Sequence, residues 1–327
     1  MVERRATYGG SGWVSRRSTL DDEIRAGDLW APLASDSGYN RLTDVLLYRP
    51  GVGIAEIDDV DRALHLRPVD PGKLGRQVDR LFETYESLGV RAHRISDDRV
   101  DDHRHPNSIF LCDVFWQTPF GAVIARMANP VRAGEERTVS ERLAELGVPI
   151  ALTIAGNGLL EGADCLWLRP GLAIVGIGVR TNESGYGQLR GWLESHGMTC
   201  LATRFDPVCQ HLTGCLQMIA PDHVLARSET LPPETIPLLR KSGLQVTSFA
   251  ESEEIRERYA FNFVVVEPGV VLLPSNCPET RTTLEAAGVR VAAEVHVSEY
   301  IAMAGGPCCA SGVLSREPVK PKKVQKH

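Results

Sequence analysis

Residues 165–200, CLWLRPGLAIVGIGVRTNESGYGQLRGWLESHGMTC, contain one complete supersecondary unit. Two apolar runs, 165–168 and 173–177, lie on either side of the turn Arg169-Pro170-Gly171, which is typical of two adjacent strands. Apolar residues at helical spacing follow, and the helix they predict ends at Gly197, directly before another short apolar run. The stretch therefore predicts strand, turn, strand, helix and strand.

The end of this helix marks a repeat along the whole chain. A predicted amphipathic helix ends at a glycine, and a short strand follows at once, at Gly89, Gly147, Gly197, Gly243 and Gly288. The intervals between these glycines are 58, 50, 46 and 45 residues. Five such units in a chain of 327 residues predict one α/β ring of five pseudo-symmetric ββαβ units rather than two separate domains. The alternative is a generic α/β fold whose helices happen to end at glycine.

Further strands are predicted from the same pattern. They are 42–48, 109–113 paired with 122–126, and 263–266 paired with 270–273. Residues 1–36 form an N-terminal lead-in with one short helix, since Ser18 and Thr19 are N-cap residue types followed by acids. The ring spans 37–316 as a single domain, and the basic segment 317–327 is expected to be a disordered tail.

The composition is that of an ordinary globular protein. The chain is 43% hydrophobic and 24% charged, and its net charge of -6 disfavours a general binder of nucleic acid or acidic membranes. No apolar run reaches the roughly 18 residues of a membrane span. The eight cysteines are too sparse for a disulfide scaffold, which suits a reducing cytoplasm. We therefore expect a cytoplasmic protein that acts on a small molecule, and a homodimer is left open.

Residues able to do chemistry collect in four segments beside the predicted strands. Asp113 closes the run 109–113, Glu161 and Asp164 stand three apart, His211 follows Cys209, and the pair Cys308-Cys309 follows a Gly-Gly-Pro turn. Paired carboxylates can face a cation, and a cysteine is a nucleophile where its pKa is lowered. The alternatives are a turn aspartate, a solvated loop, a structural histidine and a buried filler cysteine. No metal is expected, because Cys209, His211 and Cys215 lack a fourth ligand at zinc spacing.

The order and spacing of these segments resemble the guanidine-modifying enzymes of the pentein superfamily, which include arginine deiminase, dimethylarginine dimethylaminohydrolase and the amidinotransferases. Segment 105–113 resembles the deiminase pattern Pro-Asn-x-x-Phe-x-x-Asp, and 161–164 is similar to the Glu-Gly-x-Asp motif. His211-Leu212 is similar to the catalytic His-Leu, and 305–311 to the terminal Gly-Gly-x-x-Cys-x-Ser/Thr. The resemblance covers roughly residues 40–316 and implies a five-bladed α/β propeller.

The resemblance also implies a role for each site residue. Cys309 is the expected nucleophile rather than Cys308, because Ser311 follows it by two places. His211 is the expected acid and base, and Glu161 completes the catalytic set. The remaining expectations concern substrate binding: Asp113 and Asp164 hold the guanidinium, and Arg126, Arg132 or Arg180 pairs with an α-carboxylate. No cofactor is expected.

The implied function is hydrolysis of arginine or an N-methylated arginine to citrulline plus ammonia or an alkylamine, through a thiouronium on the cysteine. Segments 124–132 and 178–182 are similar to those of the dimethylarginine hydrolases. Thr213 stands where arginine deiminases have an aspartate, which argues against strict deiminase activity. Two alternatives remain: amidino transfer from arginine to an amine, and a non-catalytic pentein such as the ribosome anti-association factors.

Overall fold

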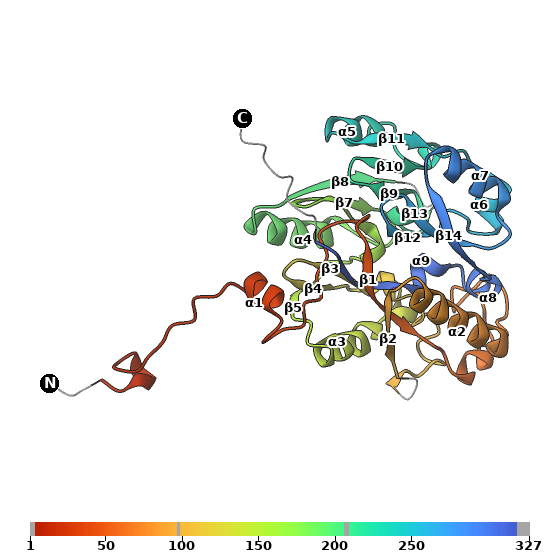
Figure 1. Cartoon of the computed structure of the whole chain (residues 1–327). Helices are drawn as coiled ribbons and strands as arrows, with labels where there is room; N and C mark the ends of the chain where they lie inside the picture. The colour runs from red at the N-terminus through yellow and green to blue at the C-terminus, as the bar shows by residue number, and fades with distance from the viewer. Residues whose placement is uncertain (1–3, 97–98, 206–208, 319–327) are drawn as a thin grey trace.

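Fifteen strands form five three-stranded sheets in the computed structural model, which describes residues 4–96, 99–205 and 209–318 (Figure 1). The strands are β1 (Leu42–Tyr48), β2 (Arg91–Ile95), β3 (Phe115–Thr118), β4 (Gly121–Ile124), β5 (Ile150–Thr153), β6 (Cys165–Arg169), β7 (Leu172–Ile177), β8 (Thr199–Arg204), β9 (Leu216–Ala220), β10 (His223–Ala226), β11 (Gln245–Ser248), β12 (Val264–Glu267), β13 (Val270–Pro274), β14 (Arg290–Val295) and β15 (Gly312–Arg316). In every sheet the middle strand is antiparallel to the first strand and parallel to the third. The predicted α/β class and the five ββαβ units are therefore confirmed.

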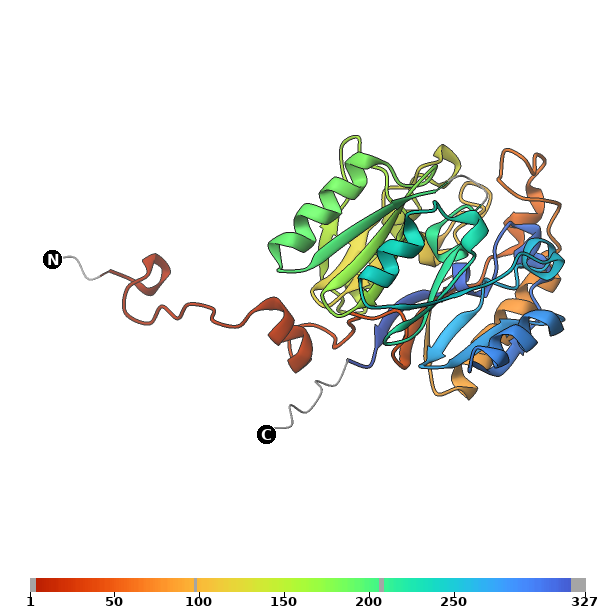
Figure 2. The ribbon, with the colours of Figure 1, turned by 90° about the horizontal axis from the view of Figure 1, so that it is seen from above.

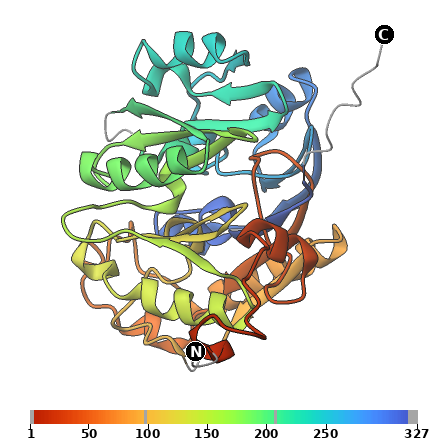
Figure 3. The same cartoon turned by 90° about the vertical axis from the view of Figure 1, so that its left-hand side faces the viewer.

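Five of the helices connect the middle strand of a sheet to its third strand, and these lie on the periphery of the molecule. The helices are α1 (Leu20–Ala26), α2 (Pro71–Ser87), α3 (Glu135–Glu145), α4 (Glu183–Ser195), α5 (Thr235–Lys241), α6 (Glu253–Glu257), α7 (Pro278–Ala286), α8 (Ser298–Ala302) and α9 (Pro307–Ala310). The connecting helices are α2, α3, α4, α5 and α7; α3 and α5 lie at opposite ends of the molecule (Figures 1 and 3). Every described helix is too short or too polar to cross a bilayer.

The unit quoted from the sequence shows why these residues fold in this way. Strands β6 and β7 pair antiparallel across a turn in which Gly171 has φ 77°, and β7 pairs parallel with β8. The Asn182 side chain caps α4 by accepting a hydrogen bond from the Gly185 N–H. Gly197 ends the helix at φ 74°, and the four corresponding glycines have φ between 74° and 84°. The repeat could be predicted from sequence because each helix ends at a left-handed backbone conformation that glycine adopts readily.

The two ends of the ring meet in one sheet. Strand β1 pairs antiparallel with β15 and parallel with β2, so the first and last strands of the chain are neighbours. Contacts between sheets run from β15 to β3, from β9 to β12 and from β12 back to β1; 3₁₀ turns make the other two junctions. Residues before α1 extend away from this body (Figure 2). The predicted N-terminal helix is present as α1, with Thr19 as its N-cap.

One predicted strand is wrong. Residues 109–113 form a turn followed by the 3₁₀ turn η4 (Leu111–Asp113), and the first strand of that sheet is β3. Local hydrogen bonds explain the difference: the Phe110 N–H donates to Asn107 O (2.9 Å), and the Asp113 N–H donates to Phe110 O (3.3 Å). The run is apolar because its side chains are buried, as they would be in an interior strand. Asp113 therefore precedes a strand instead of closing one.

Candidate active site

The site residues lie on turns that precede the first strands of the sheets. Asp113 ends η4 before β3. Glu161 precedes and Asp164 ends the 3₁₀ turn η6 (Gly162–Asp164) before β6, and His211 directly precedes the 3₁₀ turn η7 (Leu212–Gly214) before β9. Cys309 lies in the short helix α9 before β15. Equivalent turns of a pseudo-symmetric ring therefore bring residues together that are far apart in sequence.

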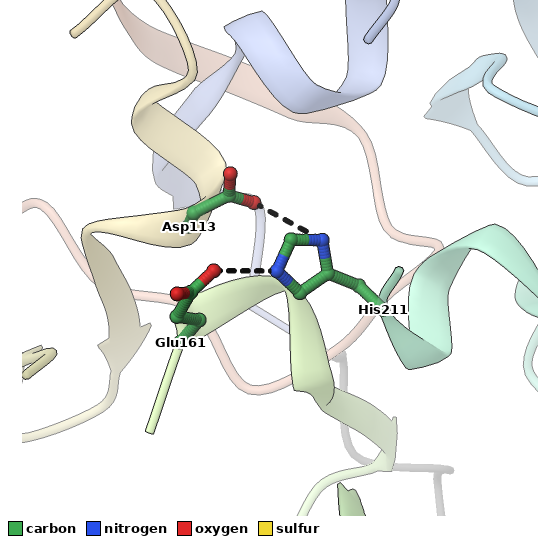
Figure 4. A group of neighbouring side chains, drawn as sticks. All are labelled: Asp113, Glu161 and His211. Carbon is green, nitrogen blue, oxygen red and sulfur yellow. Dashed lines mark hydrogen bonds and ion pairs between the residues drawn. The ribbon is translucent and has the colours of Figure 1, made fainter. Parts of the chain in front are cut away.

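His211, Glu161 and Asp113 form one buried cluster (Figure 4). His211 Nε2 lies 2.7 Å from Glu161 Oε2, and His211 Nδ1 lies 3.7 Å from Asp113 Oδ1. The carboxylate of Glu161 only accepts, so Nε2 carries the hydrogen that it donates to Glu161. Asp113 Oδ1 is buried and has no hydrogen-bond partner among the described residues. An unpartnered carboxylate oxygen of this kind is suited to receive a cationic N–H from a ligand.

The cluster holds separated charges at neutral pH. Burial lowers the pKa of His211, but the charge of Asp113 and the hydrogen bond to Glu161 outweigh it and raise that pKa to about 9. Burial likewise opposes ionisation of Glu161, but the hydrogen bond from His211 lowers the pKa of Glu161 to about 2. His211 is therefore a cation beside a carboxylate, with its Nδ1–H free to donate.

Arg132 lies in the cavity wall, but its N–H groups are used within the protein. Nη1 lies 2.5 Å from Asp113 Oδ2, Nη2 lies 2.8 Å from Glu135 Oε2, and Nη2 also donates to Phe110 O. The guanidinium is 4% exposed. Three protein acceptors surround the guanidinium, so the contacts in the structure do not favour the predicted pairing of Arg132 with a substrate carboxylate. Its charge compensates Asp113 and Glu135, and Glu135 was not among the residues predicted from sequence.

Asp164, predicted to bind the guanidinium, has both carboxylate oxygens occupied by protein donors. The Thr181 hydroxyl donates to Asp164 Oδ2 (2.6 Å), and the Leu212 N–H donates to Asp164 Oδ1 (2.9 Å). Asp164 is fully buried and is not among the described residues that line the cavity. Burial raises the pKa of Asp164 to about 6. This carboxyl group holds the backbone beside His211 and thereby orients the imidazole.

The other two predicted arginines differ in position. Arg126 is exposed, donates to Gly158 O and is not among the described lining residues of the cavity. Arg180 lines the cavity: Nη2 donates to Gln210 Oε1 (3.2 Å), and Nη1 lies 3.6 Å from Glu161 Oε1 without a hydrogen-bond partner in the described chain. Arg256, which sequence analysis missed, also lines the cavity and makes no ion pair with a described residue. Arg180 thus keeps a free donor for an anion.

Cys309 and His211 line the same cavity of about 310 Å³, together with Asp113 and Arg180. Cys308 is not among the described lining residues; its sulfur accepts from Gln217 Nε2 (3.7 Å), and its thiol interacts with Cys112. Burial raises the pKa of Cys309 to about 12, aided by the charge of Asp113. Its thiol is therefore protonated in the free site, and a bound cation would favour its ionisation.

A second thiol lines this cavity. Hydrogen bonding with Cys215 lowers the pKa of Cys209 to about 7 against burial, with help from the charge of Arg227. The Cys209 sulfur, however, accepts from Arg227 Nη1 (2.9 Å), and Arg227 is paired on its other side with Glu251. Thiol acidity alone would select Cys209, but its sulfur is engaged by Arg227. The engaged Cys209 sulfur therefore leaves Cys309 as the better candidate nucleophile among the thiols that line the cavity.

The three residues of Figure 4 have the spacing of a metal site, with one ligand atom each and all of these atoms within 4.8 Å. Their charges argue for a different role. Arg132 Nη1 lies 2.5 Å from Asp113 Oδ2 and 3.8 Å from Glu161 Oε2, so a guanidinium already supplies the positive charge. His211 is itself protonated, and a metal ligand must be the neutral imidazole. These charges favour an acid–base role for the cluster over a metal site.

No family model matches the chain, but several known proteins are similar to it in sequence and in fold. Over 210 residues the chain is 30% identical to a dimethylarginine dimethylaminohydrolase of Pseudomonas aeruginosa, with coverage of 64% of this chain and 78% of the relative. The chain belongs to the pentein superfamily of guanidine-modifying enzymes. This pentein is also 28% identical over 301 residues to an arginine deiminase of Rhodococcus erythropolis, covering 79% of this chain and 73% of that protein.

Solved structures show the same fold for this pentein. A Pseudomonas aeruginosa dimethylarginine dimethylaminohydrolase complexed with citrulline superposes with a TM-score of 0.68 and 24% identity, covering 83% of this chain and 99% of that one. An amidinotransferase from Microseira wollei gives a TM-score of 0.70 at 16% identity, covering 88% and 98%. At these identities the structures establish the fold, and the resemblance inferred from the motifs is confirmed.

Proposed function

We propose that this pentein hydrolyses a guanidino C–N bond of arginine or an N-methylated arginine, releasing citrulline and ammonia or an alkylamine. The observation that carries the proposal is the single cavity that holds a thiol, a protonated imidazole and an unpartnered carboxylate oxygen: Cys309, His211 and Asp113. A guanidinium carbon is a poor electrophile, so its chemistry needs a clamp for the cation, a nucleophile and an acid.

In this mechanism each group takes one step. The substrate guanidinium donates to Asp113 Oδ1, and its positive charge favours ionisation of Cys309. The thiol proton passes to solvent, and the Cys309 thiolate forms a C–S bond to the amidino carbon. The C–N bond to the departing amine breaks as His211 Nδ1–H gives its proton to that nitrogen. A thiouronium remains on the sulfur.

In the hydrolysis step His211 acts as a base instead of an acid. Neutral His211 takes one proton from water, the water oxygen bonds to the amidino carbon, and the C–S bond breaks to release citrulline and the Cys309 thiolate. The second proton of that water returns Cys309 to its thiol form. Throughout, Glu161 holds the imidazole through Nε2, so that Nδ1 is the atom that gains and loses the proton. Arg180, with its unpartnered Nη1, is assigned to the α-carboxylate of the substrate.

Product analysis tests this function. The protein is incubated with arginine, its methylated forms and a decarboxylated analogue, and citrulline and the amine are measured. Turnover should be lost in Cys309→Ser and retained in Cys308→Ser. Full turnover in Cys309→Ser would contradict both hydrolysis and amidino transfer through Cys309. Addition of candidate acceptor amines separates hydrolysis from amidino transfer, since transfer yields a new guanidine in place of citrulline.

A further inference from the structure

The fifth position of the ring also carries a side chain that reaches the site. The other four first strands are preceded by turns bearing Asp113, Glu161 with Asp164, His211 and Cys309. Before β12 the equivalent turn ends at Asn262, whose N–H donates to Tyr259 O (2.8 Å). Asn262 lines the same cavity as Cys309. Neither the motifs nor the resemblance pointed to it.

The orientation of the Asn262 amide follows from its neighbours. Its Oδ1 accepts from the Cys308 N–H (2.8 Å) and from the Cys309 N–H (3.3 Å). Only an oxygen can accept both hydrogens, so the other end of the amide must be the donor. That donor, Nδ2, lies 3.0 Å from Cys309 Sγ. The side chain therefore holds the backbone of α9 with one atom and the sulfur with the other.

Two glycines make this contact possible. A Cβ on Gly306 would lie 2.6 Å from Asn262 Oδ1, and a Cβ on Gly305 would lie 2.3 Å from Phe110 Cε1. The Gly-Gly pair therefore lets the backbone approach Asn262 and Phe110 closely.

We propose that Asn262 is a further catalytic residue: its Nδ2–H donates to the Cys309 sulfur and stabilises the thiolate before and during attack. The proposal rests on the proposed function, since it concerns the same nucleophile. The donor is fixed in place before a ligand arrives, because Oδ1 is anchored to the backbone of the same turn. The hydrogen bond lowers the pKa of Cys309 against the larger effects of burial and of the Asp113 charge, which raise it.

Two variants separate the two contacts of Asn262: the Nδ2–H donor to the Cys309 sulfur and the Oδ1 acceptor for the backbone of α9. Asn262→Asp keeps an oxygen for the two backbone N–H groups but loses the N–H donor, whereas Asn262→Ala loses both. Each is made in a Cys308→Ser background, so that alkylation of Cys309 by iodoacetamide is read unambiguously by peptide mass spectrometry. Rates are measured between pH 8 and 10 without substrate, and kcat, KM and Tm are measured alongside.

The expected result is slower alkylation of Cys309 in both variants, with the Tm of Asn262→Asp nearer to that of the parent. Loss of one hydrogen bond raises the thiol pKa by about one unit, so the thiolate fraction falls about tenfold. A more basic thiolate is also roughly threefold more nucleophilic, so the alkylation rate should fall by about threefold in total. The kcat should fall without a rise in KM, since Nδ2 contacts the sulfur.

Two results would overturn the proposal: an Asn262→Asp variant that alkylates and turns over like its parent, or unchanged alkylation in both variants. Should neither variant fold, the side-chain amide resonance of Asn262 in the parent is followed by ¹⁵N NMR. It should shift when Cys309 is alkylated, and an unchanged resonance would refute the contact. Failure of the proposed function would appear separately, as turnover by Cys309→Ser.

Discussion

Asp113 Oδ1 is a buried acceptor without a hydrogen-bond partner among the described residues, 3.7 Å from a protonated imidazole. At the residue scale the charge of Asp113 raises the pKa of His211, and burial together with that charge raises the pKa of Cys309. A cation bound at Asp113 would offset this charge and make the Cys309 thiol easier to ionise. Substrate binding and nucleophile activation are thus one event in our mechanism.

The motifs located this cluster, and the structure adds the contacts of each residue. Cys309, His211, Asp113 and Glu161 were predicted from spacing and from the family resemblance, and they do meet in space. The contacts of Asp164 were not predictable, because sequence shows that a carboxylate is present and not which donors reach it. Asn262 has no motif around it; only its place before the first strand of the remaining unit marks it.

Arg180 is predicted to bind the substrate carboxylate. Arg180→Met should raise KM for arginine by about 10- to 100-fold, the value of one or two charge-assisted hydrogen bonds, and should leave KM for a decarboxylated analogue nearly unchanged. Steady-state kinetics with both compounds check this. Arg126→Met is the matched control, since Arg126 is exposed and is not among the described cavity residues. Equal effects of both variants would contradict the assignment.

Glu161 is predicted to set the pH range of activity. His211 acts as an acid in its protonated form, so kcat/KM should fall as pH rises through its pKa of about 9. In Glu161→Gln that pKa moves down towards about 6.5, and the alkaline limb of kcat/KM should move down with it. The stability contribution of the raised pKa is full below about 6.5 and lost as pH rises towards 9. A pH-rate profile with an unmoved alkaline limb would contradict this.

At the scale of elements, short turns before the first strands carry the chemistry, and sheets and helices hold those turns in place. The incorrect strand at 109–113 shows where sequence reasoning fails: a buried 3₁₀ turn and a buried strand are both short apolar runs. The difference lies in local hydrogen bonds that the residue pattern does not record. The helix ends were predictable, since glycine at positive φ is a local requirement.

The turn before α9 is predicted to tolerate no side chain at Gly305. The Cβ of Gly305→Ala would overlap the Phe110 ring, and such overpacking costs about 1–3 kcal/mol. Gly191→Ala is the control: it lies in α4 with nothing within 4 Å of the added Cβ, so its free energy of unfolding should be unchanged or higher by about 0.5–1 kcal/mol. Denaturant titration compares them, and equal stabilities would contradict the packing argument.

At the scale of the whole molecule, the ring depends on a pairing between its first and last strands. The glycine repeat predicted five units, but sequence alone did not reveal that β15 completes the sheet of β1 and β2. A local residue pattern does not predict strand pairing between residues this far apart in the chain. It also carries α9, and with it Cys309, to the cavity from the far end of the chain.

Two truncations are predicted to show that the fold needs β15 but not the segment that follows it. A chain ending at residue 311 lacks β15 and leaves β1 with an unpaired edge, so it should lose cooperative unfolding. A chain ending at residue 318 keeps every described strand and should match the parent in Tm and turnover. The predicted basic tail lies largely outside the described residues. Circular dichroism melts and activity assays of the two truncations check this, and a cooperative melt of the shorter one would contradict it.

The most direct measurement of the central claim is mass spectrometry of the protein quenched in acid during turnover of arginine or an N-methylated arginine. The account predicts a thiouronium adduct on the peptide that contains Cys309, present in Cys308→Ser and absent in Cys309→Ser. An adduct on Cys308 or Cys209, or turnover with no adduct in any variant, would contradict it.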